Sequence, residues 1–173
     1  MPGIKGYEGR LLISLTDGKN LGEVKDLYLD SEARRAMAIY LGKTGLLSRK
    51  EQMIDLKHVR LYGIDAWLVA GSDLVIARQD FPGAESYQLA GDLIGREIQT
   101  EGGTRLGTIG DVIVDESGEV LGFAFGKLYF EGPLADSKAI SRAAVLRHGE
   151  ENTPAVASLE EAEKSPLPAP QAD

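Results

Sequence analysis

Four aspartates stand at matching places in the two halves of the chain. Asp26 and Asp30 lie in the first half, and Asp111 and Asp115 follow about 85 residues later. Clustered carboxylates are the groups that bind Ca²⁺ or Mg²⁺ in proteins. No Asp-x-Asp-x-Asp-Gly loop accompanies them, however. We therefore predict no metal site. Asp30 and Asp115 should close turns, while Asp26 and Asp111 should accept hydrogen bonds from backbone N–H groups.

The remaining candidates for catalysis do not form a constellation. His58 and His148 are the only histidines, and they do not occupy equivalent positions in the two halves. Neither a Ser-His-Asp order nor a His-x-x-x-His spacing is present. The pair Gly102-Gly103 lacks the Lys-Ser/Thr that follows a phosphate-binding loop. We predict no catalytic residue and no cofactor, and hence a protein that is not an enzyme.

Three residues are candidates for contact with a partner. Trp67 is either a core residue or an exposed aromatic anchor of the kind that dominates protein interfaces. Arg49 and Lys50 belong to a basic stretch that also contains Lys43, Lys57 and Arg60. That stretch is either an ordinary solvated loop or a surface that docks onto an acidic partner.

These residues are embedded in an internal repeat. The sequence LGEVKDLYLD at 21–30 reappears as LGTIGDVIVD at 106–115, and Gly9-Arg10 reappears as Gly95-Arg96. The period exceeds the roughly 20 to 50 residues of solenoid units. We therefore predict duplication of a whole domain, with one copy in 1–82, a second in 83–157, and an acidic, Pro-rich tail in 158–173.

Each copy has the pattern of a β meander. Apolar, often β-branched residues alternate with others from Val24 to Asp30 and from Ile109 to Asp115, which favours strands. Turns rich in Gly, Asp and Asn flank these segments, and second apolar strands follow at 36–41 and 120–125. Many short strands with little helix indicate a small barrel, which removes its sheet edges by closure. The predicted fold class is mainly β, with two tandem small barrels.

The end of the chain has a different composition. Ser158 and Glu161 form a capping box that predicts one short helix. Three prolines between Ser165 and Pro170 each lack an N–H donor. We predict a disordered tail from Glu163 onward.

The net charge of −8 is unevenly placed. From Ser86 onward there are 7 Lys and Arg against 15 Asp and Glu, whereas the first half is neutral. Such a chain lacks the basic array that nucleic-acid binding requires. It has no apolar run near the roughly 18 residues of a membrane span. Its lack of cysteine suits a reducing compartment. We predict a cytoplasmic protein without a transmembrane segment.

The repeated motif of an apolar residue, Gly, x, Val or Ile, x and Asp resembles the PRC-barrel domain. Its residues are Gly22, Val24 and Asp26 in the first copy and Gly107, Ile109 and Asp111 in the second. We expect all six to be structural. The first copy departs from the pattern at Ala33, where the second copy has Gly118.

The resemblance implies a small β-barrel that is used for contact rather than for catalysis. Such domains occur in the H subunit of photosynthetic reaction centres and in the ribosome maturation factor RimM. The present sequence lacks the transmembrane helix of the former and the preceding RNA-maturation domain of the latter.

The function expected from these observations is that of an adaptor or scaffold for a protein partner, with the seam between the copies as the docking groove. The alternative is a ribosome-assembly factor that binds a ribosomal protein or RNA. Formation of a homodimer and peripheral association with a membrane complex are both compatible with the sequence.

Overall fold

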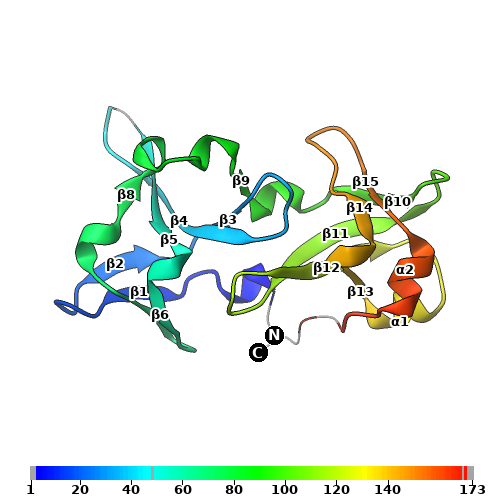
Figure 1. Cartoon of the computed structure of the whole chain (residues 1–173), viewed down its shortest axis with the longest axis horizontal. Coiled ribbons are helices and arrows are strands. Elements are labelled where there is room, and N and C mark those ends of the chain that lie inside the picture. Colours follow the sequence, from blue (N-terminus) through cyan, green and yellow to red (C-terminus); the bar gives the residue numbers. More distant parts are fainter. Residues whose placement is uncertain (1–2, 48, 169, 171–173) are drawn as a thin grey trace.

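The computed structural model describes residues 3–47, 49–168 and 170. Two units of β structure lie side by side along the long axis of the molecule, and each contains one copy of the repeat (Figure 1). The predicted mainly β fold with two tandem barrels is confirmed.

The first barrel is built from two sheets, with strand orders β2-β1-β7-β6 and β8-β5-β4-β3-β9. The strands contributed by the first copy are β1 (Leu11–Ser14), β2 (Asn20–Glu23), β3 (Asp26–Leu29), β4 (Ala36–Thr44), β5 (Lys50–Asp55), β6 (Val59–Tyr62), β7 (Ala66–Val69) and β8 (Ile76–Ala77). Its 3₁₀ turns are η1 (Ile4–Gly6), η2 (Leu56–His58), η3 (Ser72–Leu74) and η4 (Arg78–Asp80).

The second barrel has one sheet, in the order β13-β12-β11-β10-β15-β14. The strands of the second copy are β9 (Gln88–Leu89), β10 (Glu97–Thr100), β11 (Arg105–Val114), β12 (Val120–Leu128), β13 (Ala139–Ser141), β14 (Val145–Arg147) and β15 (Ala155–Ala157). The helical segments are η5 (Ala84–Ser86), η6 (Ala90–Leu93), α1 (Pro133–Ser137), η7 (Arg142–Ala144) and α2 (Leu159–Lys164).

The two copies share one topology. β1 pairs parallel with β7 in the first copy, and β10 pairs parallel with β15 in the second. The first barrel has two sheets and the second has one, and this difference arises at the motif glycines. Gly22 has φ +117°, a conformation that favours glycine, and the first copy breaks into β2 and β3 just after it. Gly107 lies inside the unbroken β11, where a Cβ would stand 2.0 Å from the carbonyl oxygen of Lys127.

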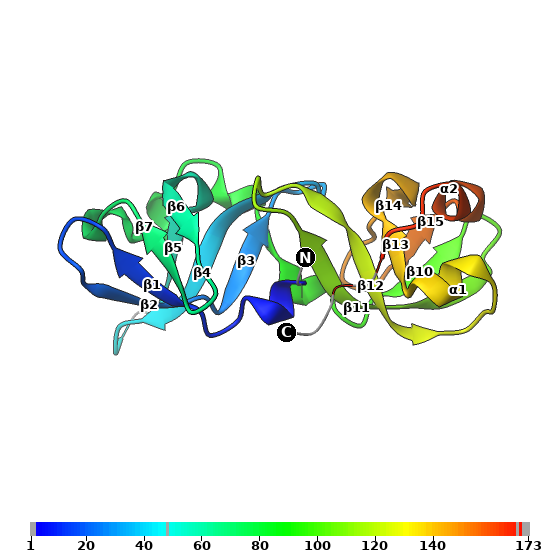
Figure 2. The same cartoon turned by 90° about the horizontal axis from the view of Figure 1, so that it is seen from below.

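The copies exchange their N-terminal segments across the seam. β9, which begins the second copy, pairs with β3 of the first. In the other direction, Gly3 forms a bridge with Ile113 of β11. The turns of the two central hairpins also meet: the Ala36 N–H donates to the Gly118 oxygen at 2.7 Å, and the Val120 N–H donates to the Arg34 oxygen at 2.8 Å. Figure 2 shows β3 and β11 on the two sides of this pseudo-two-fold seam.

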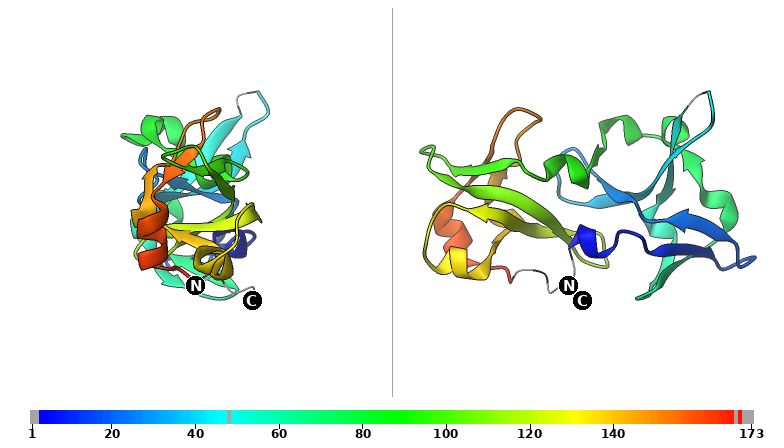
Figure 3. Two further views of the ribbon diagram at one scale, coloured as in Figure 1. Left: turned by 90° about the vertical axis from the view of Figure 1, so that its right-hand side faces the viewer. Right: turned by 180° about the vertical axis from the view of Figure 1, so that it is seen from behind.

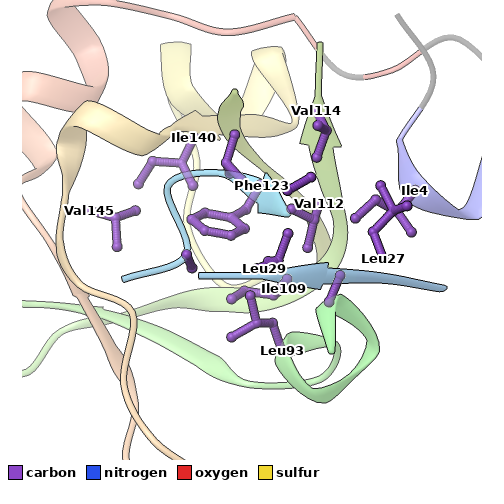
Figure 4. Close-up of a cluster of buried hydrophobic side chains, with 14 of the residues drawn as sticks. Ile4, Leu27, Leu29, Leu93, Ile109, Val112, Val114, Phe123, Ile140 and Val145 are labelled. Carbon is purple, nitrogen blue, oxygen red and sulfur yellow. The ribbon is translucent and has the colours of Figure 1, made fainter. Parts of the chain in front are cut away.

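The hydrophobic core continues from one barrel into the other. Figure 4 shows Leu27 and Leu29 of β3 together with Ile109, Val112 and Phe123 of the second barrel, all in one buried cluster. Each of these side chains is at most 1% exposed. Because apolar burial is the dominant stabilising term, the barrels are joined by packing as well as by strand pairing.

The C-terminal helix is present, and ordered contacts extend further than the sequence indicated. The Ser158 Oγ accepts a hydrogen bond from the Glu161 N–H at 3.3 Å, and Ala162 is fully buried. Beyond α2, the half-buried Leu167 lies so close to Gly122 that a Cβ there would stand 2.6 Å from its Cδ2. Residues 169 and 171–173 of the predicted disordered tail lie outside the described residues.

Candidate functional site

A groove of about 1380 Å³ opens at the seam between the barrels. One wall comes from the first barrel, through Ser31 and Glu32 in the turn after β3. The opposite wall comes from the second barrel, through residues 146–151 and 153–154 around the β14–β15 connection. Gln88 of β9 also lines the groove. The groove therefore depends on both copies.

His148 connects these walls, and Arg96 holds the loop that carries it. The His148 Nε2 lies 2.8 Å from the carbonyl oxygen of Ser31, across the seam. The Arg96 guanidinium donates to the carbonyl oxygens of His148 and Gly149, each at 2.9 Å. Burial lowers the pKa of Arg96. The His148 contact joins the two walls, and the Arg96 contacts fix the loop that forms one of them.

The sequence contained a signal for the arginine. Arg96 belongs to the repeated Gly-Arg pair, and its counterpart Arg10 binds backbone oxygens of the corresponding loop in the first copy. Arg10 donates to the carbonyl oxygens of Gly63, at 2.9 Å, and Ile64. Each copy thus uses one arginine to hold the loop that follows its β6 or β14 strand.

On the other face of the seam, Tyr62, Glu116 and Ser117, the counterparts of His148, Ser31 and Glu32, line a smaller cavity of about 340 Å³. Tyr62 stands there in the place of His148. It packs edge to face on Trp67, with ring centroids 4.9 Å apart, and Tyr7 packs on the same indole at 5.1 Å. The Tyr7 hydroxyl donates to the Val114 oxygen of the second barrel at 3.3 Å. This aromatic cluster occupies, on its side of the seam, space that is open in the groove on the other side.

Trp67 is consequently not a partner contact. Its side chain is only 2% exposed, because β7 directs alternate residues into the core and Trp67 falls on the inward face. The expectation of an exposed aromatic anchor is wrong for this residue, and the core interpretation holds.

Loop length also separates the two faces. The connection between β14 and β15 covers residues 148–154, whereas that between β6 and β7 covers only 63–65. The longer loop is fixed by the Glu150 N–H, which donates to the Thr153 Oγ1 at 2.7 Å. Gly149, at φ +76°, begins the turn, and a Cβ there would stand 2.5 Å from the Thr153 oxygen. The extra residues raise one wall of the groove.

The groove carries an excess of acidic side chains. Glu32, Asp92, Glu150 and Glu151 line it. Arg147 is the basic residue that faces them, since the Arg96 guanidinium is engaged with backbone oxygens. A ligand that carries positive charge therefore suits this site.

Comparison with models of protein families matches two segments, residues 10–74 and 87–147, to the PRC-barrel domain. The chain belongs to the PRC-barrel family. Comparison with curated proteins finds no match. Among the described residues, no helix is long and apolar enough to cross a membrane. The same residues contain no cluster of three or more His, Cys, Asp or Glu side chains arranged to hold a metal ion.

The motif aspartates of the two PRC barrels are placed at the seam. Asp26 accepts hydrogen bonds from the N–H groups of Leu27, at 2.7 Å, and of Gly91 in the other copy, at 2.9 Å. Asp111 accepts from Val112 at 2.8 Å and, across the seam, from Lys5 at 3.3 Å. Burial raises the pKa of Asp26 to about 6 and raises that of Asp111 as well.

The other aspartates of the motif close turns. The Asp30 carboxylate accepts from the Arg34 N–H at 2.7 Å, and Asp115 accepts from the N–H groups of Ser117 and Glu119 at 2.8 and 2.9 Å. Ala33 has φ +50°, in the left-handed region that Gly118 occupies in the second PRC barrel at φ +83°.

Sequence reasoning missed Arg142. It lies in η7 and is 5% exposed. Its guanidinium donates to the oxygens of Ala33 and Glu32 across the seam, at 3.0 and 2.6 Å, and to Val145 at 2.7 Å. Burial lowers its pKa. Leu56 holds the equivalent place in the first PRC barrel, so the repeat contained no signal for this clamp.

Arg49 and Lys50 lie away from the groove. Both are exposed at the β4–β5 hairpin, beside a cavity of about 540 Å³ that Glu51 and Arg78 also line. Glu51 accepts hydrogen bonds from Arg78 and from the Tyr28 hydroxyl, each at 2.9 Å. The structure therefore does not bring the basic candidates together with Trp67 or with the seam.

Proposed function

We propose that this protein is a non-enzymatic adaptor that binds an extended, basic segment of a protein partner in the seam groove. The observation that carries the proposal is the asymmetry of the seam. Beside the aromatic cluster of Tyr7, Tyr62 and Trp67 there is only a cavity of about 340 Å³, whereas the face with His148 is an acidic groove of about 1380 Å³ beneath a lengthened loop.

Two strands at the groove support binding of an extended segment. β9 is the last strand of its sheet, and β14 is the last strand of its own. Both contribute groove residues, namely Gln88, Leu146 and Arg147. The edge of a sheet offers backbone N–H and C=O groups to an added strand. A peptide laid along either edge would gain main-chain hydrogen bonds, and the groove's side chains would select its sequence.

The absence of catalysis is part of the proposal. The groove histidine contacts a backbone oxygen and the Arg96 guanidinium rather than a nucleophile. Arg96 and the buried Arg142 donate to carbonyl oxygens. The contacts of His148 and Arg142 with the first copy connect the two barrels.

In the alternative role in ribosome assembly, the negative charge of the groove disfavours RNA as the partner. Glu150 and Glu151 would repel a phosphate backbone, whereas a basic ribosomal protein would be attracted. A ribosomal partner would therefore bind as a protein and not through RNA.

A photo-crosslinking experiment tests the proposal. A photoreactive residue placed at Glu150 should capture a partner through a basic, extended segment, whereas the same residue placed at the exposed Glu101 should not. A synthetic peptide of that segment should bind the wild type. It should bind the double variant Glu150→Lys/Glu151→Lys at least about tenfold more weakly, while Glu101→Lys binds normally. Equal capture from both positions, or RNA as the captured molecule, would contradict the assignment.

A further inference from the structure

The β4–β5 hairpin presents two adjacent leucines to solvent. Leu46 and Leu47 are each 103% exposed relative to a reference residue, more than the other large hydrophobic side chains described. The hairpin projects from the first barrel, as Figure 3 shows in its right-hand view. Large apolar side chains that are fully exposed together mark an interaction site.

Basic residues surround this pair of leucines. Lys43 precedes the tip, and Arg49 and Lys50 follow it, all exposed. The nearest acidic side chain along the hairpin is Glu51, which is engaged with Arg78 at 2.9 Å. The hairpin tip therefore combines an apolar apex with a collar of three positive charges.

The second barrel shows that this tip is not required by the fold. Its equivalent connection, between β12 and β13, contains α1 and folds back so that Leu134 is 1% exposed. Phe130 packs there on Phe125, with ring centroids 5.8 Å apart. The second copy thus buries Leu134 at this position, while the first directs Leu46 and Leu47 outward.

We propose that the hairpin tip, residues 43–47 and 49–50, docks the protein on an anionic phospholipid bilayer. Apolar side chains that enter the boundary between headgroups and acyl chains, with Lys and Arg around them, are the combination that binds such surfaces. The tip is convex, so it suits penetration of a soft surface. Its positive charges match the negative potential of anionic lipids.

The remaining charge of the molecule is compatible with this orientation. The acidic Glu150 and Glu151 lie on the β14–β15 loop of the other barrel, which projects toward the same side as the hairpin but is separated from it along the long axis (Figure 1). Glu85, beside the hairpin, faces Arg49 and Lys50 across the small cavity. The length of the molecule therefore separates the apolar, basic tip from the acidic loop.

Vesicle flotation tests the proposal with the full chain. Binding is expected to phosphatidylcholine vesicles that contain about 30% phosphatidylserine, and not to phosphatidylcholine alone. The variant Leu46→Ser/Leu47→Ser should lose at least about tenfold in affinity, and Lys43→Gln/Arg49→Gln/Lys50→Gln about a hundredfold, at roughly fivefold per charge. The matched controls Ile64→Ser, at an exposed residue of another loop, and Lys127→Gln, at the position equivalent to Lys43, should bind normally.

A fluorescence measurement reports directly on insertion. The chain has no cysteine, so Leu47→Cys can be labelled at a single site with an environment-sensitive dye. Its emission should shift to the blue when anionic vesicles are added, whereas a label at Ile64→Cys should not respond. The absence of binding to anionic vesicles, or binding that survives removal of both leucines, would overturn the proposal.

Discussion

Replacement of Asp26 by asparagine should change the pH dependence of stability. The carboxylate is partly buried at the seam, where it accepts two backbone N–H groups, one from each copy. Burial raises its pKa from 3.8 to about 6. Asparagine has nearly the same shape and keeps one acceptor oxygen, but it does not ionise.

The magnitude follows from proton linkage. Because the pKa is higher in the folded state, the folded protein binds more protons than the unfolded chain between the two values. The free energy of unfolding therefore falls as the pH rises from about 4 to about 6, and it stays lower above that window. At about 1.4 kcal/mol per pKa unit, the step from 3.8 to about 6 corresponds to an upper value of about 3 kcal/mol.

Urea denaturation at several pH values between 4 and 7 measures this effect. The wild type should lose up to about 3 kcal/mol more than Asp26→Asn across that range. Asp111, whose pKa is also raised, should leave a residual slope of the same sign in the variant. Glu101→Gln, on an exposed turn, should keep the wild-type slope. If Asp26→Asn shows the same slope as the wild type, the carboxylate is not the group that titrates.

Three other substitutions test the Arg142 clamp and two structural glycines, each by urea denaturation. Arg142→Met should lower the free energy of unfolding by about 2 to 4 kcal/mol, because three carbonyl oxygens lose their donor. Arg147→Met, at an exposed residue, should change it by less than about 0.5 kcal/mol. Equal effects of the two substitutions would contradict the role of Arg142 as a clamp. Gly107→Val should cost about 1 to 3 kcal/mol, since its Cβ would meet the carbonyl oxygen of Lys127, and an unchanged midpoint would contradict this. Gly118→Ala should lower the free energy of unfolding by about 1 to 2 kcal/mol, because φ is +83° and the Cβ would stand 3.0 Å from the Ala36 oxygen. A variant more stable than the wild type would show that the alanine is not strained there.

The duplication and the strands could be predicted because both are written in local patterns. The alternation in Val24 to Asp30 reflects a strand with one buried face, and the repeated motif places the same strand in each copy. The acidic character of the groove also follows from the uneven distribution of charge.

The arrangement of the seam could not be predicted, because it depends on pairings that leave little trace in sequence. β9 has two residues, and Gly3 makes a single bridge. The groove arises from differences between the copies: the 148–154 loop is longer than its counterpart, and His148 stands where the first copy has Tyr62. A search for residues that match between the copies therefore does not find it. Arg142 could not be found from the repeat for the same reason, since its counterpart in the first copy is Leu56.

The pseudo-two-fold seam has a consequence for stoichiometry. A homodimer of one copy would carry two identical faces at its interface and would bind two equivalents of any ligand recognised there. In a chain that contains both copies the two faces need not be identical, because each is encoded by its own part of the sequence. Here Tyr7, Tyr62 and Trp67 have closed one face, while the other remains open. Under the function proposed above, each chain would offer one groove at the seam, and a partner would bind there in a one-to-one complex with a defined direction.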